Sequence, residues 1–594
     1  MEQHKYNYGI IGNCSYLALV DDRANVGWLC WPRFDSSFLF GALLDTEKGG
    51  KFSIDGENGN YTTQQQYVGN TNVLETTFIS ETDSFKVTDF APRFFQYERY
   101  YKPLMLVRKI TPIKGSPRIK VVCRPVGEYG ETKPTQLLGS NHIRYMGLEQ
   151  QVRLTTNIPL NFVMKEQSFV LNEEKYIIMT WGIPLEAELE ITAEDFLKKT
   201  KTYWNHWVKN TSTGSFHQEE VIRSALVLKL HQYEDTGAII AASTTSLPES
   251  PGSGRNWDYR YCWLRDTHYT LQALNGLSHF SELEKFSEFV ENIALTEGDR
   301  YNPLYSITIN DITPEKQLPL SGYLGNGPVR VGNQAMEHIQ NDVYGQVLVT
   351  LLPLFNDARL VHHDKSNMKG LIYHLLQMID KTMHEPDNGL WEFRNTMQLH
   401  SYTYIFHWAG SHAALLMAKK LKDNQMAKLA RKLIKDASVI LESCFDEERG
   451  VYTQAVNSKN LDASLLKLIN MGYLNPKSKK AQQHLIALEE GLRTEQGLFY
   501  RYKHQDDFGE PETTFMICAF WYVEALAKVG RVKEAIKTFE QLLTYSNHLG
   551  LLSEDVDAST GSQWGNFPQT YSHVGLVNAA FAINRKIETP SFLS

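Results

Sequence analysis

The sequence predicts an N-terminal antiparallel β-sandwich followed by a larger domain built from paired helices. Three observations carry this prediction. Short strand-like runs fill the first third of the chain, helical periodicity begins near residue 216, and short and long connections alternate between the helices that follow. With 594 residues, the chain is long enough for two or more domains.

The N-terminal region, residues 1–195, has short apolar runs without a helical stripe. Val73 to Phe90 is rich in Thr, Val and Phe, and turn-forming residues such as Asp-Gly-Glu-Asn-Gly-Asn at 55–60 separate one run from the next. Many short strands with this punctuation are typical of a sandwich. We therefore predict an antiparallel β-sandwich, of the supersandwich kind, over residues 1–195. A connecting helix from Glu194 to Lys209 is expected to lie mostly in a linker that spans 196–215.

The C-terminal region, residues 216–594, repeats its apolar side chains with the 3.6-residue period of helices. Short joins, such as 276–279 and 529–531, connect some neighbouring helices, whereas long loops separate others. Twelve helices in six hairpins is the count for an (α/α)6 barrel, with the long loops at one end. The helical windows lie near residues 219–233, 266–278, 281–296, 335–356, 366–383, 402–421, 424–442, 461–471, 479–492, 513–529, 532–546 and 571–585.

Composition and charge exclude several classes of protein. The net charge is −8 and no long basic run appears, so a nucleic-acid partner is not expected. No apolar run approaches the roughly 20 residues that cross a bilayer, so no membrane partner is expected. The six Cys residues are scattered without a CxxC pair, and no signal peptide is visible at the N-terminus, which together predict a cytoplasmic protein. The sequence leaves a homo-oligomer open.

Familiar cofactor and nucleophile motifs are missing from the sequence. The Gly-rich segment 322–327 lacks the order of a dinucleotide-binding loop and the GK[ST] of a phosphate loop. Neither GxSxG nor HExxH occurs. Paired carboxylates therefore remain as the candidate chemistry.

Two glutamates on long loops are the candidate pair. Glu392 lies between Trp391 and Phe393, whose burial of the carboxyl would raise its pKa as a general acid requires. Glu554 follows the apolar residues Leu551 and Leu552 and precedes further acids, as expected of a loop that holds a water-activating base. Taken singly, each glutamate is also consistent with a solvated surface charge.

A dense aromatic and arginine cluster occupies residues 254–266 and ends at the start of a predicted helix. Arg265 and Asp266 would hydrogen-bond the hydroxyls of a sugar while Trp257 packs on its ring. Asp266 is equally well placed as a helix N-cap or first-turn acid. Arg501 would add a second polar clamp, although a solvated loop arginine fits the sequence as well.

The longest loop, residues 297–334, is also expected to have a function, because loops of this length in compact domains are usually functional or disordered. Its Tyr301, Tyr305 and Tyr323 favour an ordered wall of the site. Tyr305, together with Trp391 from the loop of the first glutamate, is taken as a further substrate-binding residue.

These residues resemble glycoside hydrolase family 15, the glucoamylase- and trehalase-like enzymes of bacteria and archaea. The likeness runs nearly end to end and is most specific at Arg255 to Asp266, Arg-Asn-Trp-Asp-Tyr-Arg-Tyr-Cys-Trp-Leu-Arg-Asp. The resemblance implies a β-sandwich joined to an (α/α)6 barrel. It also implies that Glu392 is the general acid, that Glu554 is the general base, and that Arg265 and Asp266 grip the non-reducing glucose.

The resemblance further implies an exo-acting, inverting α-glucosidase that needs no metal or organic cofactor. Its partner would be a small oligosaccharide or disaccharide, either a malto- or isomalto-oligosaccharide or trehalose. A trehalase in the strict sense, an (α/α)6 disaccharide phosphorylase and a catalytically silent carbohydrate-binding protein stay open as alternatives.

Overall fold

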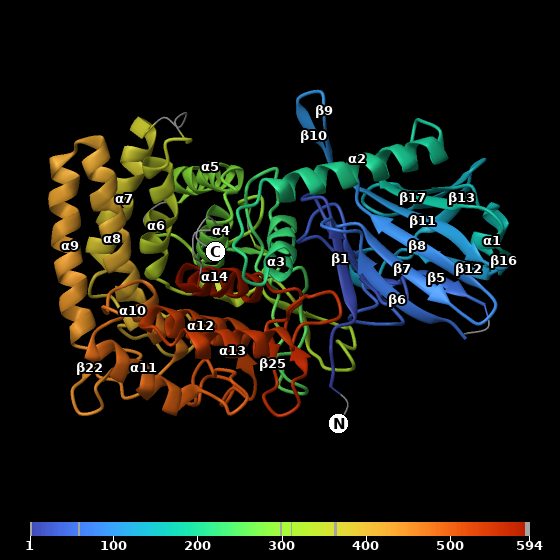
Figure 1. Ribbon diagram of the computed structural model, residues 1–594. Helices are drawn as coiled ribbons and strands as arrows, with labels where there is room; N and C mark the ends of the chain where they lie inside the picture. The colour runs from blue at the N-terminus through green and yellow to red at the C-terminus, as the bar shows by residue number, and fades with distance from the viewer. Residues whose placement is uncertain (1–2, 58–59, 298–299, 311, 361–364, 588–594) are drawn as a thin grey trace, which may run out of the picture.

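The computed structural model describes residues 3–57, 60–297, 300–310, 312–360 and 365–587 (Figure 1). Strands dominate up to residue 181 and helices dominate from residue 189 onward, so the predicted division of the chain into a strand-rich and a helix-rich region is confirmed. Figure 1 shows the two regions side by side, with the strands at one end of the molecule.

The strand-rich region contains three main antiparallel sheets that pack in a sandwich-like arrangement. The largest has the order β13 (Thr135–Leu138), β14 (His142–Met146), β15 (Val152–Thr156), β17 (Lys175–Trp181), β11 (Met105–Lys114), β8 (Ser84–Phe90), β7 (Leu74–Ile79) and β6 (Thr62–Tyr67). The second has the order β1 (Tyr8–Gly12), β2 (Leu17–Asp21), β3 (Val26–Cys30) and β4 (Phe38–Phe40), and the third β16 (Phe169–Val170), β12 (Arg118–Arg124) and β5 (Lys51–Gly56). A short helix α1 (Leu160–Met164) and the hairpin of β9 (Phe94–Gln96) and β10 (Arg99–Tyr101) complete the region.

The alternation of apolar and polar residues has the expected consequence in these sheets. In β7, Leu74, Thr76 and Phe78 are buried while the residues between them are half-buried, and the rings of Phe78 and Phe85 stack at 4.5 Å across the β7–β8 pair. One buried cross-strand pair is ionic, since Arg108 of β11 contacts Asp89 of β8 at 2.7 Å. A buried charge pair of this kind is tolerated because each charge neutralises the other.

The connecting helix α2 (Leu189–Lys209) begins five residues before the predicted Glu194. Leu189 and Ala193 are buried against residues of the large sheet, including Tyr176 and Val107, and this packing extends the helix toward the N-terminus. A buried ion pair between Arg93 and Glu234, at 2.6 Å, further ties the strand-rich part to the helices.

All twelve predicted helical windows contain helices. Six of them contact one another in a closed cycle: α4 contacts α6, α6 contacts α8, α8 contacts α10, α10 contacts α12, α12 contacts α14, and α14 contacts α4. The bounds of these six are α4 (Leu264–Gly276), α6 (Asp342–Asn356), α8 (Ser401–Leu421), α10 (Lys467–Asn470, extended by the preceding turn Ala463–Leu466), α12 (Met516–Val529) and α14 (Thr570–Ile587). The other six are α3 (Gln218–Leu230), α5 (Ser281–Thr296), α7 (Lys365–Thr382), α9 (Asn424–Glu442), α11 (Lys479–Leu492) and α13 (Val532–Leu543).

Four short strand pairs occur in the loops that precede helices of the cycle. The pairs are β18 (Cys262–Trp263) with β19 (Leu304–Tyr305), β20 (Lys316–Leu318) with β21 (Val329–Val331), and β24 (Thr514–Phe515) with β25 (Asp555–Val556), which also pairs with β26 (Gln563–Trp564). A further pair, β22 (Phe445–Asp446) with β23 (Val451–Tyr452), follows α9. These pairs fix long loops that would otherwise have few backbone hydrogen bonds.

Candidate active site

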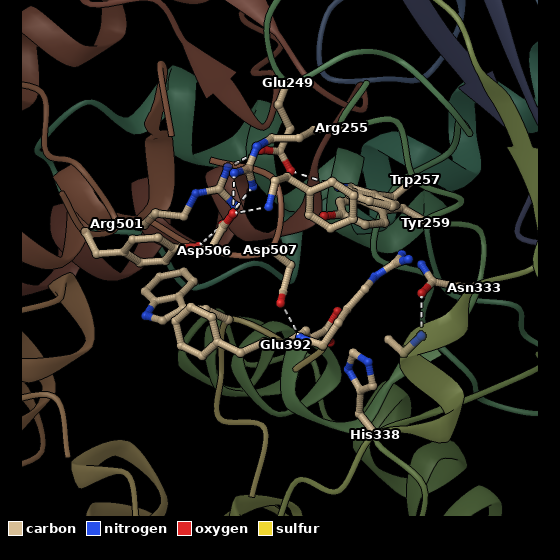
Figure 2. A pocket seen from close by; sticks show the side chains of 16 residues that line it. Glu249, Arg255, Trp257, Tyr259, Asn333, His338, Glu392, Arg501, Asp506 and Asp507 are labelled. Atoms are coloured by element: carbon tan, nitrogen blue, oxygen red, sulfur yellow. Dashed lines mark hydrogen bonds and ion pairs between the residues drawn. The ribbon is translucent and has the colours of Figure 1, made fainter. Parts of the chain in front are cut away.

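A cavity lies where the helices of the cycle begin, and the loops that precede those helices line it. It has two adjoining compartments, which share four residues: Tyr259, Trp391, Glu392 and Arg501. The first compartment is also lined by Glu249, Arg255, Trp257, Asn333, Ala335, His338, Phe393, Arg394, Tyr502, Asp506, Asp507 and Phe508 (Figure 2). The second is also lined by Ala241, Trp263, Arg265, Asp266, Leu390, Phe515, Gln569 and Tyr571.

Arg265 lies in the first turn of α4 and connects several parts of the second compartment. Its guanidinium donates to the Tyr571 hydroxyl at 3.0 Å, to Gln340 Oε1 at 2.8 Å and to Glu392 Oε1 at 3.2 Å. Arg265 is 7% exposed, so these partners hold a buried cation in one orientation. The structure therefore brings Arg265 and Glu392, which are 127 residues apart in the sequence, into contact.

Asp266 is adjacent to Arg265 and equally buried, but it does not cap the helix. The N-cap position of α4 is Trp263, and no side chain caps this end. Asp266 Oδ2 lies 3.5 Å from Arg265 Nε and accepts no hydrogen bond. Burial raises the pKa of Asp266 to about 7, with Arg265 opposing the shift and Glu392 adding to it. Asp266 is thus a first-turn acid and not the N-cap, and it lines the second compartment.

Glu392 occupies the boundary between the compartments. A tight turn after Gly389 presents it, and its backbone has a φ of 61°, a left-handed value that is uncommon outside glycine. Its Oε1 accepts hydrogen bonds from Trp263 Nε1 at 2.8 Å and from Gln340 Nε2 at 3.1 Å, in addition to Arg265. Three donors on one oxygen stabilise the ionised carboxylate.

The expected direction of the Glu392 pKa is wrong. Burial alone raises the pKa of this carboxyl, but the Arg265 guanidinium, His338 and the two uncharged donors outweigh burial and leave the pKa below its usual value. The indole N–H of the neighbouring Trp391 donates to Asp462 at 2.9 Å and not to Glu392.

Glu554 is buried immediately before β25 and itself lines neither compartment. Its Oε1 accepts a hydrogen bond from the Tyr259 hydroxyl at 2.8 Å, and its Oε2 accepts one from the Asn566 backbone N–H at 3.1 Å. Gly565 has a φ of 74°, and a Cβ atom there would lie 2.6 Å from Glu554 Cβ, so only glycine fits against this side chain. Tyr259 connects Glu554 to the cavity, because it lines both compartments.

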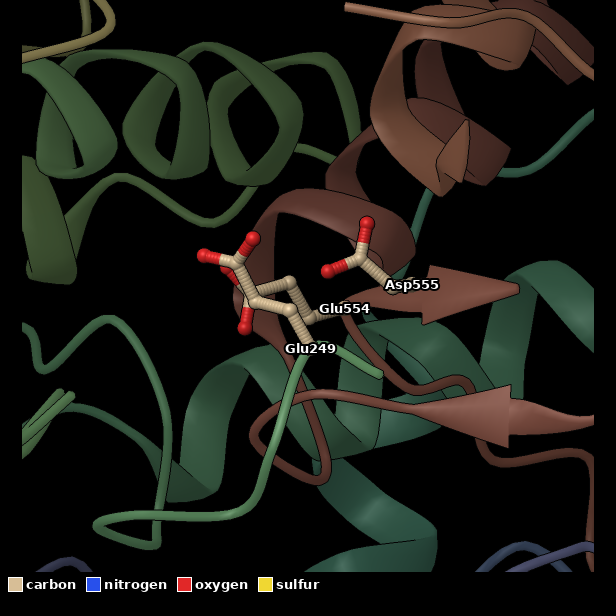
Figure 3. Close-up of side chains that lie close together, drawn as sticks. All are labelled: Glu249, Glu554 and Asp555. Atoms are coloured by element: carbon tan, nitrogen blue, oxygen red, sulfur yellow. The ribbon is translucent and has the colours of Figure 1, made fainter. Parts of the chain in front are cut away.

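A cluster of three carboxylates surrounds this position (Figure 3). Oxygens of Glu249, Glu554 and Asp555 lie within 4.8 Å of one another, and all three residues are buried. Burial and the negative charge of Glu249 raise the pKa of Glu554 to about 8. The pKa of Asp555 is also raised by burial and by Glu554, and neither of its oxygens has a hydrogen-bond partner.

Glu249 and Arg501 form a buried ion pair at the edge of the acid cluster. Glu249 also accepts a hydrogen bond from Trp257 Nε1 at 3.0 Å, and Arg501 is 8% exposed. The alternative of a solvated loop arginine is therefore wrong for Arg501. Both predicted residues, Trp257 and Arg501, line the first compartment.

The acid cluster is also the group of residues best placed to hold a cation. Four of the six oxygens of the three carboxylates already accept hydrogen bonds from protein donors, two each on Glu249 and Glu554. Asp555 alone offers two unpartnered oxygens. Protons on Glu554 and Asp555 would neutralise the cluster without a metal, in keeping with their raised pKa values.

One predicted residue lies elsewhere. Tyr305 is in β19, opposite Cys262 of β18, and its hydroxyl accepts a hydrogen bond from the Asn302 backbone N–H at 2.9 Å. It lines neither compartment. Its loop instead supports the strand pair that precedes α4, so the geometry gives no support for direct substrate binding by Tyr305.

Several residues of the site were not singled out in the sequence, although Arg255 and Tyr259 lie inside the aromatic cluster. Arg255 forms an ion pair with Asp506 at 2.6 Å in the first compartment. Glu249 followed a Pro in an unremarkable loop, and Tyr571 opened a predicted helix. The sequence shows Glu249 only as an acidic residue on the loop that leads into the aromatic cluster, and acidic residues are common on surface loops.

The fold and the site define an enzyme of the glycoside hydrolase class, and comparison with known proteins specifies the family. A family model described as glycosyl hydrolases family 15 matches residues 215–581, and one described as trehalase-like, N-terminal, matches residues 6–168. The chain belongs to glycosyl hydrolase family 15.

Individual relatives match along nearly the whole chain. A trehalase of Thermoplasma volcanium is 31% identical over 586 residues, covering 96% of this chain and 92% of the relative. A trehalase of Mycobacterium tuberculosis is 29% identical, covering 98% of this chain and 90% of the relative. Among solved structures, a bacterial glucoamylase complexed with acarbose shares the fold, with a TM-score of 0.68 at 13% identity over 98% of this chain and 95% of that one. Within the described ranges, no helix is long and apolar enough to cross a membrane.

Proposed function

We propose that the protein is an exo-acting, inverting α-glucosidase whose substrate is trehalose. The observation that carries this proposal is the two-compartment cavity with Glu392 at the boundary. A disaccharide would place one ring in each compartment and its glycosidic oxygen beside Glu392. The similarity to trehalases over more than nine-tenths of the chain supports trehalose among the α-linked disaccharides.

The second compartment would hold the glucose unit that is attacked. Arg265 and Asp266, which line this compartment, would bind its hydroxyls, as donor and acceptor respectively. The first compartment would hold the leaving glucose between the Trp257 ring and the polar groups of Arg255 and Arg501. These paired polar contacts favour a sugar, because an apolar ligand would leave them unsatisfied.

The reaction would use two carboxyl groups and one water. Glu392, carrying a proton, gives it to the glycosidic oxygen as the bond to the anomeric carbon breaks. Glu554, ionised, takes a proton from a water that attacks the opposite face of the ring, which inverts the anomeric centre. Tyr259 would hold the Glu554 carboxylate in position through its hydrogen bond. Metal and organic cofactors have no step in this scheme.

The protonation states in the empty cavity are the reverse of those that this reaction needs. The lowered pKa of Glu392 and the pKa of about 8 at Glu554 place the proton mainly on Glu554. We propose that a bound glucose takes over hydrogen bonds of Arg265 and expels water, which weakens the stabilisation of the Glu392 carboxylate. The reactive form is then the one with the proton on Glu392.

We also propose a fold class and domain boundaries. The closed cycle of six helix contacts, each helix having an outer neighbour, supports an (α/α)6 barrel. We propose residues 1–195 as the sandwich domain, 196–215 as the linker and 216–594 as the catalytic domain. The cytoplasmic location and a homo-oligomeric state stay predictions.

Product stereochemistry and a substrate panel test the proposal. Proton NMR of a fresh trehalose digest should show α- and β-glucose in equal initial amounts, because only the attacked unit inverts. A retaining enzyme would release α-glucose alone and would refute the mechanism. Trehalose should be hydrolysed faster than maltose, isomaltose, kojibiose and nigerose; preference for one of the others would indicate a glucoamylase-like enzyme. Phosphate-dependent release of glucose 1-phosphate would indicate a phosphorylase. No turnover of any of these disaccharides would indicate a catalytically silent binding protein.

A further inference from the structure

A second, larger cavity lies at the opposite end of the helix cycle from the candidate active site. It has a volume of about 500 Å³ and is lined by residues of all six helices of the cycle. None of its lining residues belongs to either compartment described above. A cavity of this size is within the range of small-molecule binding sites.

The cavity exists because α10 is short. Together with its preceding turn, this helix runs only from Ala463 to Asn470, whereas its neighbours are α8, with 21 residues, and α12, with 14 (Figure 1). Where α10 stops, α8 and α12 continue, and the space between them is not filled by another helix of the cycle.

The charged residues of this lining are mostly cationic. Lys467, Lys528 and Arg585 face one carboxylate, Glu524, which gives the cavity a net charge of +2. The two histidines do not change this balance near neutral pH. Burial lowers the pKa of His268 to about 3, with Lys467 adding to the shift, and burial also lowers the pKa of His412.

Lys467 is the one of these cations that is deeply buried. It is 4% exposed, and no acceptor among the described residues forms a hydrogen bond with its Nζ. The nearest carboxylate oxygen, on Glu524, is 3.9 Å away, and Glu524 contacts Lys528 more closely, at 2.8 Å. The rings of Tyr269 and Trp521 lie 4.7 and 5.1 Å from Nζ and stabilise the ammonium only in part.

A buried ammonium has three N–H donors that lose their water partners on folding, so leaving them unpaired costs free energy. Burial lowers the pKa of Lys467 to about 8, with Glu524 opposing the shift, so the group is still mainly charged at pH 7. Its N–H donors therefore need an acceptor. Because the Lys467 side chain lines the cavity, a ligand bound in the cavity could supply it.

We propose that this cavity is a binding site for an oxyanion, with Lys467 as its buried anchor and Lys528 and Arg585 as further cationic contacts. The shared chemistry is that of a sulfate, phosphate or carboxylate group. The excess of positive charge excludes a metal cation as the occupant. The aromatic walls formed by Trp408 and Phe581 leave room for an organic body attached to the oxyanion, such as a sugar ring.

Isothermal titration calorimetry on the full-length protein tests this site, with three probes at constant ionic strength. Sulfate tests the oxyanion alone, glucose 6-phosphate an oxyanion on a sugar, and glucose the sugar alone. We expect saturable binding of sulfate and tighter binding of glucose 6-phosphate. Sulfate and glucose 6-phosphate of equal affinity would indicate that a free oxyanion is the natural occupant. Binding of glucose alone with the affinity of glucose 6-phosphate would overturn the oxyanion assignment.

Three variants locate the binding. Lys467→Met should reduce oxyanion affinity at least tenfold, because it removes the buried charge while keeping an apolar chain of similar length. Arg585→Ala, on the exposed rim, should weaken binding severalfold and keeps the assay usable if Lys467→Met does not fold. Arg394→Met is the matched control, since it removes an arginine from the first compartment instead. Unchanged affinity in both Lys467→Met and Arg585→Ala, or a loss only in Arg394→Met, would refute the site. Because these outcomes do not depend on glucoside turnover, they stay distinct from a failure of the proposed function.

Discussion

The acid cluster predicts how the pH dependence of the enzyme responds to loss of one carboxylate, Glu249. In the free enzyme, Glu392 and Glu554 together carry one proton between the lowered pKa of Glu392 and the pKa of about 8 at Glu554. Above pH 8 both are ionised and no proton is left for the glycosidic oxygen. We therefore expect kcat/KM for trehalose to be level between the pKa of Glu392 and pH 8 and to fall on either side of this range.

Glu249→Gln removes a negative charge while keeping an acceptor for Trp257. With oxygens of the two carboxylates within 4.8 Å, the lost repulsion is about 3.5 kcal/mol at an effective dielectric constant of 20. That energy corresponds to a decrease of about 2.5 units in the pKa of Glu554. The sign is fixed, since ionisation of Glu554 becomes easier, and the alkaline limb should move to lower pH by about 1 to 2.5 units.

The assay is kcat/KM for trehalose between pH 4 and 10, with circular dichroism to verify folding. Asp506→Asn is the matched control, because Asp506 is also paired with an arginine of the first compartment but lies outside the acid cluster. It should leave the alkaline limb in place. A Glu249→Gln variant that is folded and active, with its alkaline limb within about 0.3 pH unit of the wild type, would refute the coupling between Glu249 and Glu554.

Three further predictions concern single carboxyl groups. Glu392→Gln should reduce kcat on trehalose by several orders of magnitude but have a far smaller effect on α-glucosyl fluoride, whose leaving group needs little protonation; steady-state kinetics with equal losses on both would exclude Glu392 as the acid. Glu554→Gln should increase the free energy of unfolding at pH 9 by a few kcal/mol and raise the melting temperature there. The reason is that a carboxyl group with a raised pKa contributes stability below about pH 4.5 that is lost as the pH rises through 8; calorimetry at pH 4 should therefore show no gain. Asp266→Asn should lower kcat/KM at least a hundredfold without lowering the melting temperature, because Asp266 caps no helix; a parallel fall in melting temperature would assign it a structural role.

Much of the fold could be predicted from the sequence because it depends on local periodicity. The twelve helical windows were confirmed, and so was the order of a strand-rich region, predicted to end at residue 195, before a helix-rich one. Boundaries were less accurate where tertiary packing decides them. Helix α2 begins at Leu189 because that side chain finds an apolar surface on the sheet, which the local pattern around Glu194 does not reveal.

The candidate site could be predicted only in part, for a physical reason. Motifs located Arg265, Asp266, Trp257 and the two glutamates, which the structure places in or beside one cavity. Tyr305 lines neither compartment, and an aromatic residue on a long loop is as useful in packing as in binding. It is buried in the β18–β19 pair, where its hydroxyl accepts a hydrogen bond from the Asn302 N–H.

The pKa of Glu392 shows most clearly what a single sequence cannot contain. Its neighbours in the chain, Trp391 and Phe393, predict desolvation and a raised pKa, and desolvation is indeed present. The opposing charge comes from Arg265, 127 residues earlier in the chain, and the cluster that raises the pKa of Glu554 depends on Glu249, 305 residues away from it. In the proposed mechanism, the free enzyme would hold its proton on Glu554 instead of Glu392. Binding energy from the sugar hydroxyls at Arg265 would then be needed to move the proton toward Glu392, which would couple turnover to correct occupation of the second compartment.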